Sequence, residues 1–329
     1  MASAGHGVPM VIPPGLHALL AEQGGVFTTG QAISAGLVGH ELARLRSRRR
    51  LVRLRRGVWT TQVTWDQAAT PERHLLHARA VATHLSDPFV MSHVTAAAAY
   101  DLPLHQVSTD LVHVTRPGRP SATRHEAGVC HHTGPVPNQA TAAGLPVTDL
   151  ARAVFDLARV SGRASAVAAM DVALGRGLAV EDLQDVVSSC ERWPGARAAA
   201  RALALADGRA ESVGESLSRL AFGAVGLLPD ELQWAVSAEG HDYETDFAWT
   251  GRGVVGEFDG KVKYGRLLRP GQTVSDVLVA ERQRELRIER TGWHVVRFTW
   301  AEIHDLGLVR SRLIEAFARR SAGRSSPVA

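Results

Sequence analysis

The chain has 329 residues, of which 45% are hydrophobic, and this length and composition suit two or three domains with buried cores. The sequence has no run of 18 apolar residues and does not start like a signal peptide, so it argues against a transmembrane helix and predicts a cytoplasmic protein. Two cysteines, Cys130 and Cys190, are too few for a disulfide framework, and the small net charge of +4 hides a local concentration of arginine.

The first folded segment, residues 16–65, follows a stretch, residues 1–15, that we expect to be disordered. The sequence TGQAISAGL predicts a short helix that ends at Gly36, and VGHELARLRSRR predicts a second helix with Leu42 and Leu45 on its apolar face. LVRLRRGVWTT then predicts a two-stranded hairpin. A helix, a glycine-containing turn, a second helix and a basic hairpin together predict a winged helix-turn-helix domain.

Eight arginines lie within thirteen residues of this segment, and only Glu41 offsets their charge nearby. Such a density of positive charge is typical of a surface that binds the phosphates of double-stranded DNA. The alternative is a solvated basic face, or arginines that pair with acids elsewhere in the fold. The predicted DNA-binding residues are Arg44, Arg46, Arg48, Arg49, Arg50, Arg53, Arg55 and Arg56.

The same segment resembles the N-terminal domain of AbiEi-family antitoxins, which are transcriptional autorepressors of type IV toxin–antitoxin systems. The resemblance rests on GVFTTGQAISAGL and LARLRSRRRLVRLRRGVW. It implies double-stranded DNA as one partner and a cognate toxin as a second.

Residues 66–208 predict a mixed α/β middle domain, which also looks like the part that follows the winged helix in AbiEi-like proteins. DLVHVT and GVCHHT alternate like strands, and DLARAVFDLARV reads as a helix with Thr148 as its N-cap. Cys130, His131 and His132 are adjacent and cannot all face one metal ion, and CxxC or HxxxH partners are missing. We therefore expect His93 and His113 to be packing or surface residues rather than zinc ligands.

The polar stretch from Asp207 to Ser212 predicts a boundary, after which residues 209–320 form a third domain and residues 321–329 a loose tail. The order helix, strands, helix, strand, helix in this domain fits a small α/β core. The sequence as a whole predicts a multidomain α+β or α/β protein.

Two short apolar runs of the third domain carry acids. Asp246 lies in DFAW, and GVVGEFDG carries Glu257 and Asp259 two positions apart, so that both project from one face of a strand. Neighbouring carboxylates repel unless a divalent metal compensates them, and Lys261 and Lys263 follow at once. This combination suits metal-assisted phosphodiester hydrolysis. The alternative is a strand that ends in a solvated Asp-Gly turn.

The third domain resembles the PD-(D/E)xK nuclease superfamily, especially domains related to very-short-patch repair endonucleases. The resemblance covers residues 211–319 and rests on GESLSRLAF, DFAW, GEFDGKVKY and AERQRELRIERTGWHVVRFTW. It implies a restriction-endonuclease-like core that holds Mg²⁺ (or Mn²⁺) through Asp246 and Glu257, with Asp259 as an added acid.

The same resemblance assigns a catalytic acid to Glu215 on the preceding helix and a catalytic lysine to the central strand. Many members place this lysine two residues after the acid, where this chain has Asp259, so the role passes to Lys261 or Lys263. Glu215 also completes the capping box Ser212-x-x-Glu215, and capping alone is an equal alternative for it.

Two functions follow from these patterns. The first is a DNA-binding protein with a metal-dependent endonuclease domain. The second is a non-enzymatic AbiEi-like antitoxin or repressor with a degenerate nuclease fold. Asp259 in place of lysine favours the second, whereas the retained Asp246, Glu257 and nearby lysines favour the first. A nuclease that acts on RNA is a third alternative.

Overall fold

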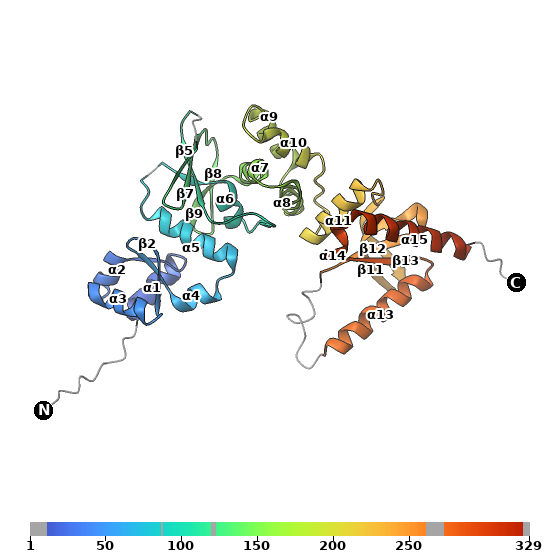
Figure 1. The fold of residues 1–329 in the computed structure, drawn as a ribbon, viewed down its shortest axis with the longest axis horizontal. Helices are drawn as coiled ribbons and strands as arrows, with labels where there is room; N and C mark the ends of the chain where they lie inside the picture. Colours follow the sequence, from blue (N-terminus) through green and yellow to red (C-terminus); the bar gives the residue numbers. More distant parts are fainter. Residues whose placement is uncertain (1–11, 87, 120–122, 261–272, 325–329) are drawn as a thin grey trace. The chain divides into compact units, whose positions relative to one another are not determined.

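The computed structural model describes residues 12–86, 88–119, 123–260 and 273–324 (Figure 1). The chain divides into two compact units, the first comprising Met1–Ala169 and Leu178–Ala200, the second Met170–Gly177 and Arg201–Ala329. Each unit combines helices with sheets, so the predicted mixed α/β, multidomain class is confirmed. Within the described residues, none of the helices has the length and apolar character needed to cross a membrane.

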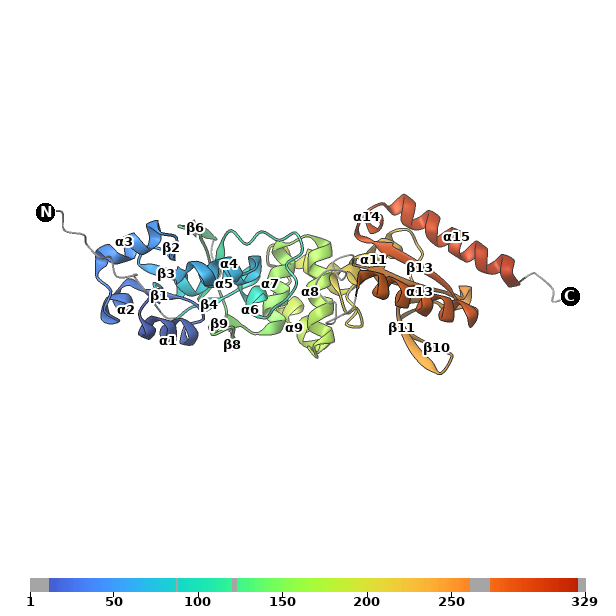
Figure 2. The same ribbon diagram turned by 90° about the horizontal axis from the view of Figure 1, so that it is seen from below.

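The N-terminal part of the first unit contains the helices and the hairpin that the sequence predicts, gathered around a small sheet of order β1-β3-β2 (Figures 1 and 2). The first helix begins at Pro14, inside the stretch expected to be disordered, because proline fits the first turn of a helix and Leu16 is fully buried. The elements are α1 (Pro14–Glu22), β1 (Phe27–Thr28), α2 (Thr29–Ser34), α3 (Gly39–Ser47), β2 (Leu51–Arg55) and β3 (Val58–Thr61).

Side chains define the start of both short helices. The Thr28 hydroxyl accepts a hydrogen bond from the Gln31 amide, while the Gln31 side chain accepts one from the Thr28 amide. The Val38 amide donates to Glu41 in the same manner at the start of α3. The apolar faces then meet in one core, made of Leu16, Leu20, Phe27, Ala32, Leu37, Leu42, Leu45, Leu51 and Trp59.

The middle region has a six-stranded mixed sheet of order β6-β7-β5-β4-β9-β8. Its elements are α4 (Gln62–Gln67), α5 (Thr70–Ala82), β4 (Val90–Met91), α6 (His93–Ala99), β5 (Val112–Pro117), β6 (Arg124–Glu126), β7 (Val129–Gly134), β8 (Gln139–Ala142), β9 (Leu145–Thr148), α7 (Leu150–Val160), α8 (Arg163–Gly175), α9 (Val180–Ser189) and α10 (Ala196–Leu203). The N-cap of α7 is Asp149, which accepts from the Arg152 amide, so the prediction of Thr148 was wrong by one residue. A carboxylate is the stronger acceptor at a helix start.

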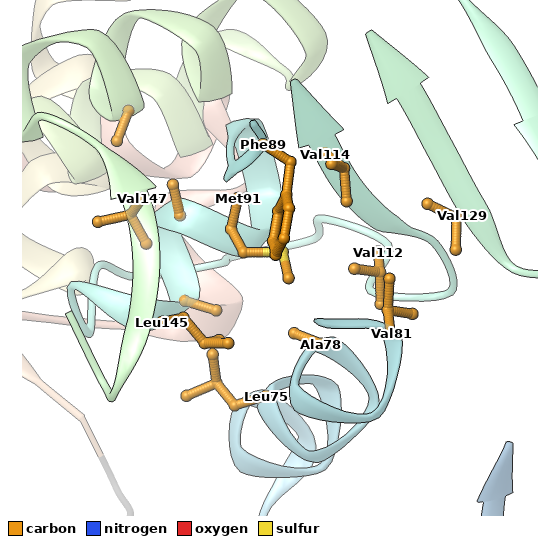
Figure 3. Close-up of a cluster of buried hydrophobic side chains, with 13 residues drawn as sticks. Leu75, Ala78, Val81, Phe89, Met91, Val112, Val114, Val129, Leu145 and Val147 are labelled. Carbon is orange, nitrogen blue, oxygen red and sulfur yellow. The ribbon is translucent and has the colours of Figure 1, made fainter. Parts of the chain in front are cut away.

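One face of this sheet packs against α5. Val112 and Val114 of β5, with Val129 of β7, contact Leu75 and Val81 of that helix (Figure 3). Because side chains alternate along a strand, the residues between these valines project from the opposite face. The register pairs His113 with Cys130 and Thr115 with His132, so these four residues are neighbours on that face.

The second unit contains a four-stranded sheet of order β10-β11-β12-β13, in which only β12 and β13 are parallel. Figure 2 shows the β10–β11 hairpin at one side of this unit. The elements are α11 (Val213–Ala224), β10 (Glu231–Ala238), β11 (His241–Trp249), the 3₁₀ turn η1 (Thr250–Arg252), β12 (Val254–Asp259), α13 (Val274–Arg290), β13 (His294–Thr299), α14 (Trp300–Ile303) and α15 (Leu306–Arg324), which extends into the predicted tail.

The two faces of this sheet carry different helices. Phe222 of α11 packs edge-on against Phe247 and Phe298 on one face. Ile288 of α13 packs with Val255 and the strands around it on the other. Because Glu257 and Asp259 alternate with Phe258, they share the side of Val255, on which Glu257 meets Arg284 of α13.

A close approach between α11 and β12 fixes the acidic strand from behind. A Cβ atom on Gly214 would lie 1.9 Å from Cε1 of Phe258, whose ring also packs edge-on against Trp300 at 4.9 Å. Glycine at position 214 therefore allows the ring to lie directly on the helix backbone.

We expect Gly214→Ala to destabilise the protein by about 1–3 kcal/mol, because the added methyl group overpacks this contact. The gain of about 1 kcal/mol in helix propensity is smaller. Gly223→Ala, on the same helix, is the matched control, since its Cβ would lie 3.3 Å from the end of the Leu228 side chain. Urea unfolding of both variants measures the difference, and equal stabilities would contradict the close packing of Phe258.

Candidate nucleic-acid interface and acidic pocket

The eight arginines predicted to bind DNA lie on consecutive pieces of structure. Arg44 and Arg46 are on α3, the next three occupy the turn after it, Arg53 and Arg55 are on β2, and Arg56 is in the turn between β2 and β3. All are exposed except Arg55, which is partly buried. Arg49 follows the C-cap of α3 with a left-handed backbone (φ 52°), which ends the helix and leaves its side chain exposed.

In the described parts of the chain, these arginines are not ion-pair partners of acids. Among the described residues, no ion pair joins any of the eight to an acid, and the guanidinium of Arg53 instead lies 5.9 Å from the ring centroid of Trp59. Eight positive charges thus lie close together on one stretch of surface, and none of them is paired with an acid among the described residues. Such a surface attracts a polyanion. The lack of ion pairs also contradicts the alternative that these arginines pair with acids elsewhere in the described chain.

Helix α3 has one exposed face, which includes Arg44 and three residues outside the arginine cluster. His40, Ala43, Arg44 and Ser47 recur at helical spacing and are all exposed, while Leu42 and Leu45 are buried on the opposite side. The face of α3 that looks away from the core therefore carries side chains that can donate to or accept from base edges.

The three predicted metal-binding acids of the second unit line one pocket of about 210 Å³. Asp246 of β11 and Glu257 with Asp259 of β12 all contribute to it, as the alternation of the strands predicts. One carboxylate oxygen of Asp246 accepts a 2.6 Å hydrogen bond from the Phe258 amide and so links the two strands. The pocket is lined by Asp246, Glu257, Phe258, Asp259, Gly260, Glu281, Arg284 and Arg297.

Two arginines hold Glu257 in place. Arg284 of α13 donates to one of its carboxylate oxygens, and Nε of Arg297, the register partner on β13, lies 3.3 Å from the other. Arg297 also lies 3.7 Å from Glu281 and from Glu285 on α13. The pocket therefore contains an alternating network of acids and arginines rather than carboxylates alone.

Glu215 is not part of this pocket. It lies in the first turn of α11, where Ser212 donates to one carboxylate oxygen at 2.7 Å and the Glu211 amide donates to the other at 2.8 Å. Gln233 donates to that second oxygen as well. Burial raises the pKa of Glu215, and the hydrogen bonds from Ser212 and Glu211 counteract this rise. These bonds favour the capping alternative for Glu215, and its catalytic role stays a prediction.

The lysines predicted for catalysis, Lys261 and Lys263, lie outside the described residues. The donor chemistry of the pocket fits a hard divalent cation, because Asp246, Glu257 and Asp259 offer carboxylate oxygens, which Mg²⁺ and Mn²⁺ prefer. A cation at Glu257 would compete with Arg284 and Arg297 for the same oxygens.

Sequence reasoning missed Glu281, Arg284 and Arg297 as members of the pocket. In the charged helix sequence AERQRELRIER, Glu281 and Arg284 are three residues apart and share one helix face, a spacing from which their shared place beside the pocket could have been expected. The sequence alone indicates a role for Arg297, because it is the charged residue inside the apolar strand WHVVRFTW. A charge in a buried strand needs a partner.

In the comparison with models of known protein families, the N-terminal segment matches one family. The family model described as "Transcriptional regulator, AbiEi antitoxin" matches residues 16–62, which run from α1 to the end of the β2–β3 hairpin. No curated protein matches the sequence. The segment that carries the exposed arginine cluster is thus similar to a regulator domain of AbiEi antitoxins.

Proposed function

We propose that this protein is a DNA-binding transcriptional regulator of the AbiEi antitoxin type. The observation that carries the proposal is the cluster of eight arginines on α3, the following turn and the β2–β3 hairpin, inside the segment that matches the regulator model. Their exposure and their lack of ion pairs within the described chain favour a polyanionic partner.

The order of elements supports a winged helix-turn-helix mode of binding. In this mode α3 is the recognition helix, so His40, Ala43, Arg44 and Ser47 approach base edges in the major groove. The β2–β3 hairpin is the wing, and Arg53, Arg55 and Arg56 contact phosphates that fix the register of the domain.

A shift assay with the full chain and the duplex upstream of its own coding region tests this function, with an unrelated duplex of equal length as the control. We expect tighter binding to the upstream duplex and repression of a reporter that it drives. The antitoxin part of the proposal further predicts a cognate toxin whose effect on growth the protein suppresses. Equal binding to both duplexes together with an unchanged reporter would sink the regulator proposal.

A second candidate function is hydrolysis of phosphodiester bonds by the second unit. The observation that favours it is the convergence of Asp246, Glu257 and Asp259 from two strands in one pocket, beside Glu281. This arrangement agrees with a PD-(D/E)xK-like core. The observation against it is the pairing of Glu257 with two arginines.

Asp246, Glu257 and Asp259 would hold Mg²⁺ or Mn²⁺ in such an enzyme. The bound cation would supply Lewis-acid stabilisation of the charge that develops on the phosphate. Arg284 and Arg297 orient Glu257 and add positive charge beside the pocket, which suits a phosphate oxygen. Lys261 or Lys263 would orient the attacking water, and Glu215 remains the acid of the preceding helix.

Mg²⁺ or Mn²⁺ should raise the melting temperature of the full chain if these carboxylates bind the cation, because a ligand of the folded state stabilises it by about 2.7 kcal/mol at 100 times its Kd. Glu257→Gln removes one negative charge but keeps an oxygen acceptor for Arg284, so most of the gain should disappear. Glu231→Gln, an exposed acid outside the pocket, is the matched control. An equal shift in all three proteins would show that the cation binds elsewhere.

A further inference from the structure

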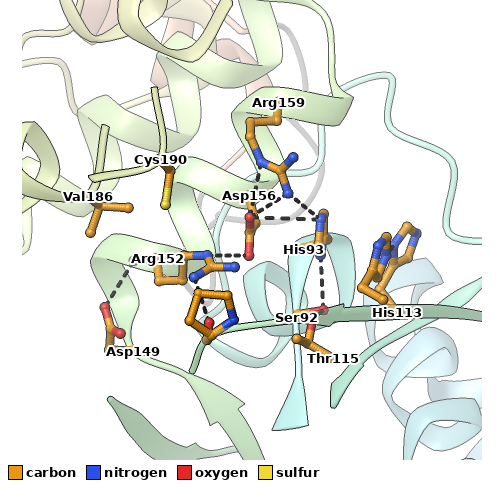
Figure 4. A network of polar contacts seen from close by, with 12 residues as sticks. Ser92, His93, His113, Thr115, Asp149, Arg152, Asp156, Arg159, Val186 and Cys190 are labelled. Carbon is orange, nitrogen blue, oxygen red and sulfur yellow. Dashed lines mark hydrogen bonds and ion pairs between the residues drawn. The ribbon is translucent and has the colours of Figure 1, made fainter. Parts of the chain in front are cut away.

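Three histidines from distant parts of the sequence meet on the face of the six-stranded sheet that lies opposite α5. His93 starts α6, His113 is on β5 and His132 is on β7, and one ring nitrogen of each lies within 4.8 Å of those of the others. Figure 4 shows His93 and His113 beside the buried side chains of α7. Cys130, two residues before His132 on β7, belongs to the same face.

Two of the distances between these groups are close to those between ligands of one metal ion. His132 Nε2 lies 3.0 Å from Nδ1 of His113 and 3.3 Å from Sγ of Cys130. Zinc bonds of about 2.0–2.1 Å to nitrogen and about 2.3 Å to sulfur place tetrahedral ligands roughly 3.3–3.7 Å apart. The ligand nitrogens of the three histidines lie within 4.8 Å of one another, a group that does not include Sγ of Cys130, so side-chain rotation must bring the four donors around one ion.

The histidines are in the protonation state that a metal needs. Burial, together with the neighbouring positive groups, lowers the pKa of His113 to about 3 and that of His132 to about 4. Burial also lowers the pKa of His93. Each ring is thus neutral near pH 7 and keeps one nitrogen lone pair.

The fold also orients His93 towards this cluster at some cost. His93 adopts a left-handed backbone (φ 50°), which is unfavourable for a residue with a Cβ atom. Its Nδ1 lies 3.0 Å from the Ser92 hydroxyl, and its Nε2 accepts from Arg159 at 2.9 Å, so Nε2 carries a lone pair (Figure 4). Arg159 keeps its bonds to Asp156 and to the Pro194 carbonyl if it releases His93.

We propose that His93, His113, His132 and Cys130 bind one Zn²⁺ ion as a closed, structural site that joins the start of α6 to strands β5 and β7. Nitrogen and sulfur donors select zinc over the magnesium preferred by carboxylates. The rings of His93 and His132 stack with centroids 3.9 Å apart, so they turn on binding until their in-plane lone pairs meet at the ion. Cys130 loses its proton as the thiolate–zinc bond forms.

Titration of the full chain with Zn²⁺, in excess Mg²⁺ to occupy carboxylate sites, is the first test. We expect one high-affinity Zn²⁺ per chain and a higher melting temperature. Co²⁺ in place of Zn²⁺ should give the visible bands of a tetrahedral site and a thiolate charge-transfer band. Wild-type protein that binds neither ion under these conditions would overturn the proposal without the use of any variant.

Matched variants test the ligand set. His132→Asn and Cys130→Ser should each weaken Zn²⁺ binding by at least about 100-fold, since even the loss of an outer partner costs 10–100-fold. His131→Asn, whose side chain alternates to the other face, and Cys190→Ser should bind like the wild type. Circular dichroism checks that each variant is folded. Loss of binding in the His131→Asn control, or an unchanged charge-transfer band in Cys130→Ser, would overturn the assigned ligands.

Discussion

Replacing Arg46, Arg49 and Arg53 together by alanine should strongly weaken binding of duplex DNA and flatten its dependence on salt. Each phosphate contact contributes about −0.9 to the slope of log K against log salt, so three lost contacts reduce the slope by about 2.7. Raising salt from about 50 to about 200 mM should then weaken the variant about 40-fold less than it weakens the wild type. Fluorescence anisotropy at several salt concentrations measures both quantities.

A variant with the same loss of charge is needed as the control, because net charge alone changes association. Arg124, Arg163 and Arg197 are exposed arginines outside the cluster, and their triple alanine variant carries an equal change of three charges. It should retain most of the wild-type affinity and slope. If both triple variants lose affinity alike, the effect is due to overall charge, and the cluster is not the DNA-binding surface.

Local patterns explain why much of the fold was predictable from the sequence. The capping pair Thr28 and Gln31 and the alternation of Glu257 with Phe258 depend on residues at most three positions apart. The helices and hairpin of the N-terminal segment and the shared strand face of Glu257 and Asp259 follow from such short-range rules, whereas the place of Asp246 beside them was implied by the nuclease resemblance. Even the error at Thr148 was one residue, because two adjacent residues were both suitable caps.

The contacts that sequence reasoning missed join residues far apart in the chain. Arg284 reaches Glu257 across 27 residues, and His93 reaches Arg159 across 66. Single-sequence patterns carry no information on which strand becomes a neighbour in the sheet. We therefore expected His93 and His113 to be packing or surface residues, although the order β7-β5-β4 brings the elements of His93, His113 and His132 together.

The second large effect separates an enzyme from a regulator. If the acidic pocket hydrolyses DNA, Glu257→Gln and Asp246→Asn should each lower metal-dependent cleavage of plasmid DNA by at least about 100-fold, because loss of a direct ligand exceeds the cost of losing an outer one. Both changes keep an oxygen acceptor, for Arg284 and for the Phe258 amide respectively, so the strands should stay folded. Affinity for duplex DNA should stay nearly constant, since the arginine cluster belongs to the first unit.

Further variants identify the other groups of the pocket. Lys261→Ala and Lys263→Ala, measured one at a time, should differ, because the nuclease resemblance assigns the catalytic lysine to only one of the two positions. Glu215→Gln should lower the stability of α11 more than the rate if its role is capping alone, as its bonds to Ser212 and Glu211 indicate. Cleavage that persists at full rate in Glu257→Gln would assign the activity to another site or to a contaminant. A wild-type protein that cuts neither duplex, single-stranded DNA nor RNA, yet represses its own promoter, would leave Glu257 as a structural partner of Arg284 and Arg297 in a degenerate nuclease fold.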